Sequence, residues 1–198
     1  MSKKGSITTS DYLPFDEYVR LVDSLEEDGD YRGAAYCIIS FSFGLRIHDV
    51  LTIKWCQVIG RSNLVITEHK TGKTKRIKIG FNTEERLHRL YQKMDDANYN
   101  KEIAVNRRGT PLSSQYINKW LKACKKKYNL KIENFSSHTF RKTLGRYVYE
   151  KMGRTEESLI LLCRIFRHSN VNITMTYLGL RDDEINGIFE ISYPPLKG

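Results

Sequence analysis

The sequence predicts an α+β fold that is mainly α, with helices packed around one small antiparallel hairpin. Apolar residues recur at helical spacing along most of the 198 residues. Only residues 63–79, NLVITEHKTGKTKRIKI, carry two β-rich runs around a central glycine. The length suits one domain with at most a small appendage. Together these observations predict a helical domain with a single small sheet.

The N-terminal part of the chain predicts one amphipathic helix and one buried helix. Pro14 suits the first turn of the amphipathic helix. Its apolar positions recur at helical spacing, at Phe15, Val19, Val22 and Leu25. The stretch YRGAAYCIISFSFG is apolar nearly all round, as is typical of a buried helix, and Gly44 can cap its C-terminus. The stretch RIHDVLTI then predicts a short helix.

The remaining elements follow in order from residue 63. The turn Thr71-Gly72-Lys73 predicts a hairpin because Gly72 can supply positive φ. A helix in TEERLHRLYQKM, a short strand in EIAV and a turn in RRGTPLS come next. SSQYINKWLKACKKKY predicts a serine-capped helix, and SSHTFRKTLGRYVYEKMG a helix capped by Ser136 or Ser137 and ended by Gly153. ESLILLCRIF continues the helical pattern, and RDDEINGIFEI predicts an amphipathic C-terminal helix.

The charge composition indicates a polyanionic partner. The chain has 33 Lys and Arg against 23 Asp and Glu, a formal net charge of +10. Nucleic acid is preferred to a membrane surface because no basic amphipathic helix or apolar run of spanning length occurs. The N-terminus MSKKGSITTS is too short and polar for a signal peptide. Four scattered cysteines without a Cys-x-x-Cys pair predict neither a metal site nor a disulfide framework, and a reducing cytoplasm fits.

Three stretches carry side chains suited to phosphate chemistry. His138 and Arg141 are three residues apart at the start of a predicted helix, where the helix dipole attracts anions. Arg46 and Asp49 have the spacing of an intrahelical ion pair, and equally that of an arginine oriented by a carboxylate toward a phosphate. Lys70 lies at the tip of a basic hairpin, where a lysine serves either solubility or proton donation in a DNA groove.

A fourth stretch, FRHSNVNITMTYLG, places His168 nine residues before Tyr177. At about 100° per residue, one unbroken helix would put the two side chains on opposite faces. If they cooperate, the helix must break between them. Ser169 and Asn170 are suited to break it because their side chains compete for backbone hydrogen bonds. Tyr177 would then lie on a second short helix.

Taken in order, GLRIHDVL, HKTGKTKRIKI, HTFRKT, FRHSNVNITMTY and LGLRDDEI resemble the catalytic domain of tyrosine recombinases, the phage integrase family. The resemblance runs from about Leu13 to the C-terminal helix. We therefore expect residues 1–12 to be a polar segment and residues 13–198 to be the catalytic domain, with no N-terminal core-binding domain. That arrangement is similar either to a catalytic fragment of an integrase or to short bacterial DNA-inversion recombinases.

The resemblance implies catalytic roles for several side chains. Arg46 and Arg141 look like the arginines that clamp the scissile phosphate, with Asp49 as the acidic residue supporting the first. Lys70 looks like the lysine that protonates the leaving oxygen. Tyr177 matches the nucleophile.

The two histidines match the remaining positions of the family pattern. We expect His138 to act as general base and His168 to donate a hydrogen bond to the phosphate. The sequence departs from the pattern at Phe166-Arg167, where the family commonly has Leu-Gly, and at Phe140, which replaces a frequent leucine. We therefore expect that the conformation of the turn before His168 can differ from the one that is common in the family.

The resemblance also implies partners and an outcome. Double-stranded DNA with a specific recombination site is the expected substrate, with self-association as a tetramer and accessory DNA-bending proteins, in the nucleoid of a bacterial cytoplasm. No metal, cofactor or membrane is expected. Further DNA contacts are expected from Lys73, Lys75, Arg76, Lys125, Lys126, Lys127 and Arg167. Integration, excision and inversion stay open, and the alternatives are type IB topoisomerase activity or a catalytically idle DNA-binding regulator.

Overall fold

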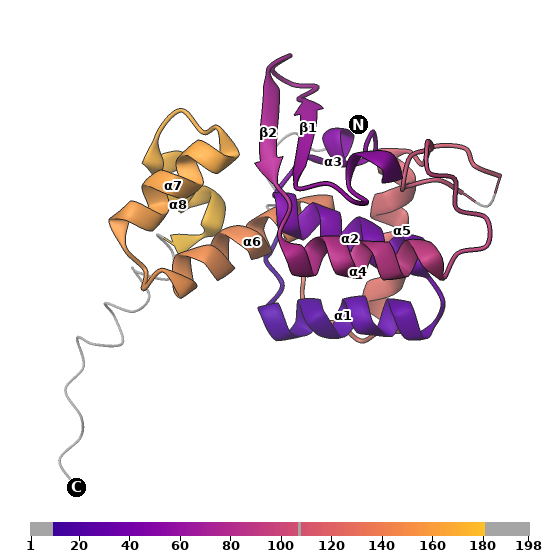
Figure 1. The fold of residues 1–198 in the computed structure, drawn as a ribbon. Helices are drawn as coiled ribbons and strands as arrows, with labels where there is room; N and C mark the ends of the chain where they lie inside the picture. Colours follow the sequence, from indigo (N-terminus) through magenta and orange to yellow (C-terminus); the bar gives the residue numbers. More distant parts are fainter. Residues whose placement is uncertain (1–9, 107, 181–198) are drawn as a thin grey trace, which may run out of the picture. The chain divides into compact units, whose positions relative to one another are not determined.

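The computed structural model describes residues 10–106 and 108–180, which form helices and one two-stranded antiparallel sheet (Figure 1). The elements in chain order are α1 (Phe15–Glu27), α2 (Tyr31–Phe43), α3 (Ile47–Val50), the 3-10 helix η1 (Trp55–Gln57), β1 (Asn63–Thr67), β2 (Thr74–Lys78), α4 (Phe81–Gln92), α5 (Ser114–Lys127), α6 (Ser137–Lys151), α7 (Glu156–Phe166) and α8 (Val171–Leu178). The predicted mainly helical fold with one hairpin is confirmed. The described residues divide into two compact units, one that ends at Leu144 and one that begins at Gly145, so the boundary falls within α6.

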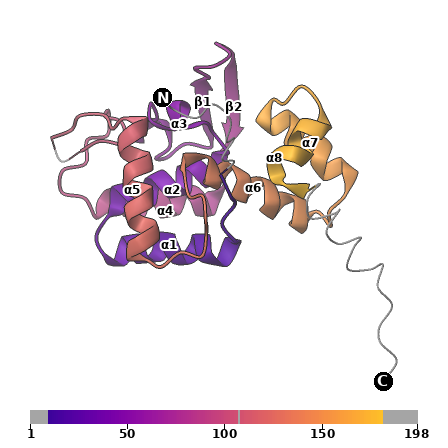
Figure 2. The same ribbon diagram turned by 180° about the vertical axis from the view of Figure 1, so that it is seen from behind.

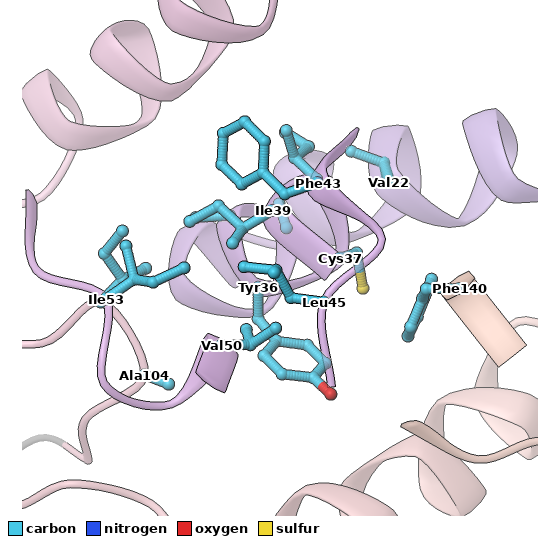
Figure 3. Packing of buried hydrophobic residues seen from close by; sticks show 14 of the residues in the cluster. Val22, Tyr36, Cys37, Ile39, Phe43, Leu45, Val50, Ile53, Ala104 and Phe140 are labelled. Atoms are coloured by element: carbon cyan, nitrogen blue, oxygen red, sulfur yellow. The ribbon is translucent and has the colours of Figure 1, made fainter. Parts of the chain in front are cut away.

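Helix α2 is the centre of the core of the first unit. Nine of its thirteen residues are buried, because its own apolar residues occupy almost all of its faces. Figures 1 and 2, which view the unit from opposite sides, show α4 on one side of α2 and α5 on the other. Figure 3 shows the α2 side chains Tyr36, Cys37, Ile39 and Phe43 among those of neighbouring segments. The helix ends at Gly44 in the left-handed conformation, as predicted.

Helix α1 packs on α2 through one buried stripe. The buried stripe is Tyr18, Leu21, Val22 and Leu25, which are spaced as one helical face. Phe15 is 40% exposed because it lies in the first turn, where only part of its ring meets the core. The helix was predicted correctly from its periodicity. Of the other apolar positions that predicted it, Val22 and Leu25 are buried and Val19 packs partly buried against the core.

The hairpin pairs β1 with β2 in antiparallel register from Asn63 opposite Lys78 to Thr67 opposite Thr74. Gly72 has a φ of 64° in the turn, which confirms the predicted role of this glycine. The hairpin projects from the helices of the first unit (Figure 1).

The predicted strand in EIAV is wrong. This segment forms only isolated bridges, Lys54 to Glu102 and Val105 to Pro111. Its backbone pairs with two different segments, since the amide of Ile103 donates to one and the carbonyl of Ala104 accepts from the other. Two partners in succession prevent a continuous ladder, although the residue types favour a strand.

The second unit contains the C-terminal turns of α6 together with α7 and α8. Phe166 and Leu178 are buried, and both approach Gly145 so closely that a Cβ atom there would collide with them. The predicted C-terminal helix RDDEINGIFEI begins at residue 181 and lies outside the described residues. Within residues 10–106 and 108–180, no helix combines the length and apolar character needed to cross a lipid bilayer.

Candidate active site

Arg46 is positioned by the end of the buried helix α2. Gly44 closes that helix with a φ of 54°, and the buried Leu45 anchors the following residue to the core. Arg46 takes an extended conformation as the N-cap of α3. Its side chain is 22% exposed, yet Nη1 is buried and has no hydrogen-bond acceptor among the described residues. A buried guanidinium N–H without an acceptor is costly, so this atom favours the binding of an anion.

The carboxylate that faces Arg46 belongs to Glu68. Oε2 of Glu68 lies 3.9 Å from Nη1 of Arg46, an ionic contact that is too long for a hydrogen bond. Glu68 is only 2% exposed because it continues the inward alternation of Leu64 and Ile66 along β1. A buried acid thus lies beside the arginine, and it comes from the hairpin rather than from α3.

Asp49 contacts the hairpin backbone instead. Its Oδ1 accepts a hydrogen bond of 2.8 Å from the backbone amide of His69, and its buried Oδ2 accepts none within the described part of the chain. The intrahelical ion pair with Arg46 is not formed among these residues. The physical reason is that Arg46 precedes α3 in an extended conformation, so the spacing that brings side chains together along a helix does not apply.

Helix α6 carries two more of the predicted catalytic residues, His138 and Arg141. Oγ of Ser136 accepts a hydrogen bond from the His138 amide at 3.3 Å, so Ser136 caps the helix. Arg141 lies one turn later and is 4% exposed. Its Nη1 donates to the carbonyl oxygen of Gly44. That contact holds Arg141 at the junction of α2 and α3, where the first arginine also lies.

The surroundings of His138 lower its pKa. Desolvation by neighbouring atoms is the largest cause, and repulsion from Arg141, Arg46 and Lys142 adds to it. The imidazole is therefore neutral at pH 7 and can accept a proton. The first unit thus combines concentrated positive charge with a neutral base.

Lys70 lies in the hairpin turn and is exposed. Lys73 and Arg76 are also exposed, so both are available to an external partner. Lys75 is half-buried because its position lies opposite Ile66 on the inner face of the hairpin. The hairpin therefore presents most of its basic residues at its tip and outer face.

Two of the three predicted DNA-binding lysines on α5 already have structural contacts. Nζ of Lys125 donates to the carbonyl oxygen of Glu133 at 2.8 Å, and Lys127 forms an ion pair of 2.7 Å with Asp28. Lys126 is exposed. A polyanion would have to compete with the contacts of the first two lysines.

The break between His168 and Tyr177 occurs as predicted. Helix α7 ends at Phe166, and the Asn170 side chain accepts a hydrogen bond of 3.0 Å from the amide three residues later, which caps α8. The chain reverses at this break and brings the His168 and Tyr177 rings into edge-to-face contact. Their centroids are 5.3 Å apart and their planes are inclined by 74°.

His168 is fixed by the residues around the break. Nδ1 of its ring lies 3.0 Å from Oγ1 of Thr174, and its backbone amide donates to the Cys163 carbonyl at 3.0 Å. Phe166 contacts both the His168 and Tyr177 rings, with centroid distances of 5.5 and 5.6 Å. The second unit therefore holds a half-buried tyrosine against an oriented imidazole.

Arg167 ends α7 in the left-handed conformation, with φ 51° and ψ 47°. This conformation costs an ordinary residue about 1–2 kcal/mol relative to the right-handed one, and glycine adopts it readily. Arg167 thus takes the backbone conformation that a glycine at this position would favour. The departure from the Leu-Gly pattern therefore leaves a glycine-type turn in place.

Sequence reasoning missed three residues that shape these groups. Glu68 could have been found by extending the strand alternation one step beyond β1. Thr174 and Arg146 carry no comparable signal, because their roles depend on the packing of α8. Nε of Arg146 donates to the carbonyl of Leu178 at 2.7 Å and Nη2 to that of Gly179 at 3.3 Å, so Arg146 secures the C-terminal end of α8.

Of the six predicted catalytic residues, four lie in the first unit, and His168 and Tyr177 lie in the second. The first unit can bind a phosphate and accept or donate a proton, whereas the second carries a phenol that can act as a nucleophile.

A cavity of about 680 Å³ is lined by Tyr31, Tyr36 and Trp120, among others, and none of the six predicted catalytic residues lines it. Within the described ranges, no three His, Cys, Asp or Glu side chains are placed to hold a metal ion.

Comparison with known proteins identifies similar sequences and folds. The family described as Phage integrase family matches residues 11–184. The chain is 27% identical over 154 residues to the probable integrase/recombinase YoeC of Bacillus subtilis (strain 168), covering 78% of this chain and 81% of that protein. This relative is similar over most of its own length.

Solved structures share the fold at lower identity. The XerA recombinase superposes with a TM-score of 0.68 at 21% identity, covering 93% of this chain and 65% of that one. A λ integrase tetramer bound to a Holliday junction gives a TM-score of 0.64 at 19% identity, covering 89% of this chain. The chain spans half the length of that integrase.

Proposed function

Because this chain belongs to the phage integrase family, we propose that it is a site-specific DNA recombinase that cleaves and rejoins strands through a 3′-phosphotyrosyl intermediate. The observation that carries the proposal is the group of cations around His138. It contains a buried Arg46 Nη1 that has no hydrogen-bond acceptor among the described residues. The nonbridging oxygens of a phosphodiester could accept the hydrogen bonds of this guanidinium group.

The arginines would stabilise the charge that develops on the phosphate. When a nucleophile attacks phosphorus, negative charge grows on the nonbridging oxygens, and guanidinium groups match that geometry with paired hydrogen bonds. Arg46 and Arg141 are both anchored to the α2–α3 junction, so little reorganisation would be needed. Rigid placement is what makes such donors effective in a transition state.

The nucleophile would be the phenol oxygen of Tyr177. Its attack forms the bond from phosphorus to the tyrosine oxygen and breaks the bond from phosphorus to the 5′ oxygen of the strand. The phenolic proton would pass to His138, which is neutral at pH 7, and Lys70 would protonate the departing 5′ oxygen. With the Thr174 hydroxyl donating to Nδ1, Nε2 of His168 would carry the proton that it donates to the phosphate. The step conserves bond energy, so a second 5′ hydroxyl can reverse it.

Double-stranded DNA with a specific recombination site is the proposed partner, and we propose that the chain assembles on it as a tetramer. The λ integrase structure named above is such an assembly on a Holliday junction. The net charge of +10 and the exposed basic residues of the hairpin support the proposed DNA binding. Accessory DNA-bending proteins, and the choice among integration, excision and inversion, depend on the DNA site.

Covalent trapping on a nicked substrate tests the proposal. The substrate carries the native flanking DNA with a nick beside the cut, so that the released fragment diffuses away and the protein stays attached. Wild-type protein should give a band resistant to denaturant, and Tyr177→Phe should bind the same DNA but give no such band. Equal trapping by the variant would remove Tyr177 from the proposed role, and site-independent relaxation of supercoiled plasmid would indicate a topoisomerase.

A further inference from the structure

We infer that His48 and His69 form a clamp that positions Lys70 for protonation of the leaving oxygen. In this assignment the two histidines are positioning residues, and Lys70 is the group that contacts the reacting atoms. The inference deepens the proposed function and rests on it. It is carried by two contacts that tie the base of the hairpin turn to α3.

The first contact joins the two imidazole rings. The His48 and His69 centroids are 5.4 Å apart and the planes are inclined by 29°, a stacked arrangement. Both side chains are exposed, so the hydrophobic core does not force them together. The stack connects the residue directly before Lys70 with the middle of α3.

The second contact joins the backbone of the same residue to the same helix. The amide of His69 donates to Oδ1 of Asp49 at 2.8 Å. Asp49 is 3% exposed, so its carboxylate is a fixed point of the core surface rather than a mobile group. His69 is therefore held through its ring by His48 and through its backbone by Asp49, and these holding residues are adjacent in α3.

The clamp matters because it joins Lys70 to the first arginine. Arg46 is the N-cap of α3, so one short helix carries that arginine together with both residues that hold His69. Local hydrogen bonds close the turn itself, such as that from the Gly72 amide to the Glu68 carbonyl at 2.8 Å. Local bonds shape the turn but do not fix its distance from the phosphate. A two-stranded hairpin alone is marginally stable, so an external tether is needed for accurate placement.

The contribution to rate follows from placement rather than from charge. A shift of about 1 Å in a catalytic group can slow a reaction by about a hundredfold. We expect His48→Ala and His69→Ala each to slow strand cleavage by about ten- to a hundredfold. His69→Phe keeps an aromatic ring for stacking and should restore most of the rate.

The experiment compares two leaving groups under single-turnover conditions. One nicked substrate has the normal 5′ bridging oxygen, and the other has sulfur at that position. A thiol is a much stronger acid than an alcohol, so sulfur leaves as thiolate without a proton donor. Lys70→Ala, His48→Ala and His69→Ala should all be slow on the oxygen substrate and close to wild type on the sulfur substrate. His88→Ala, which changes a half-buried histidine on α4, is the matched control and should be unchanged on both.

The outcomes separate the inference from the proposed function. Failure of the wild-type protein to form a covalent complex on either substrate would contradict the proposed function. Rescue of Lys70→Ala by sulfur without rescue of the histidine variants would overturn the clamp and leave the lysine assignment standing. Wild-type rates for both histidine variants on the oxygen substrate would also overturn it. Thermal melting of each variant checks that a slow rate does not come from unfolding.

Discussion

At the scale of single residues, the charge around His138 is the feature with the clearest solution consequence. Its pKa is lowered by desolvation and by Arg141, Arg46 and Lys142. The His-x-x-Arg spacing in the sequence predicted that the side chains of His138 and Arg141 share one face of a helix. It did not predict the acid beside Arg46, because Glu68 belongs to no motif and is placed by strand alternation.

The lowered pKa of His138 predicts a pH-dependent stability. Between its folded pKa and the ordinary value of about 6.5, the unfolded chain binds a proton that the folded chain does not. The folded state therefore loses stability as pH falls through about 6.5, and the loss levels off below the folded pKa. His138→Asn should remove this component. Between pH 8 and pH 5, the melting temperature of the wild type should fall more than that of the variant. Parallel plots of melting temperature against pH would contradict the lowered pKa of His138.

Arg141 provides a second test at this scale. Arg141→Lys keeps the positive charge but loses the paired N–H groups that match a phosphate. We expect single-turnover cleavage to slow by about a hundredfold, the scale of losing one transition-state donor. Because Arg141 also donates to the Gly44 carbonyl, unfolding curves must accompany the rates. Cleavage within about threefold of wild type would contradict the proposal that Arg141 binds the scissile phosphate.

At the scale of elements, the break between α7 and α8 explains why a histidine and a tyrosine nine residues apart touch. Sequence reasoning located this break because Ser169 and Asn170 compete with helical hydrogen bonding. It also located the buried helix and the hairpin from their periodicity. It failed for EIAV, whose residue types favour a strand but whose two pairing partners lie on different segments. Pairing partners depend on tertiary packing, which local patterns do not encode.

The cap of α8 gives a prediction about the placement of Tyr177. The Asn170 side chain accepts a hydrogen bond from the Ile173 amide at 3.0 Å. Asn170→Ala should lower the free energy of unfolding by about 1 kcal/mol, whereas Asn170→Ser should keep the cap. Urea unfolding measures the stability, and covalent trapping measures the effect on Tyr177. Equal stability of the alanine and serine variants would show that the cap does not hold α8.

At the scale of the whole molecule, the residues proposed to act on one phosphate are divided between two compact units. The first unit holds Arg46, Lys70, His138 and Arg141, and the second holds His168 and Tyr177. The sequence predicted these residues only when its motifs were taken together, since each motif alone has an ordinary structural explanation. The division into two units was not predicted, because the boundary falls inside α6, where no break in the helical pattern marks it.

The central claim is that Tyr177, and no other tyrosine of the chain, becomes joined to DNA. Its most direct test is to trap the covalent complex on a nicked substrate, digest both protein and DNA, and locate the remaining nucleotide by mass spectrometry. The chain has twelve tyrosines, so the location is informative. We predict a 3′-linked nucleotide on the peptide that contains Tyr177 and on no other. A nucleotide on a different tyrosine, or a trapped complex that persists in Tyr177→Phe, would contradict the account.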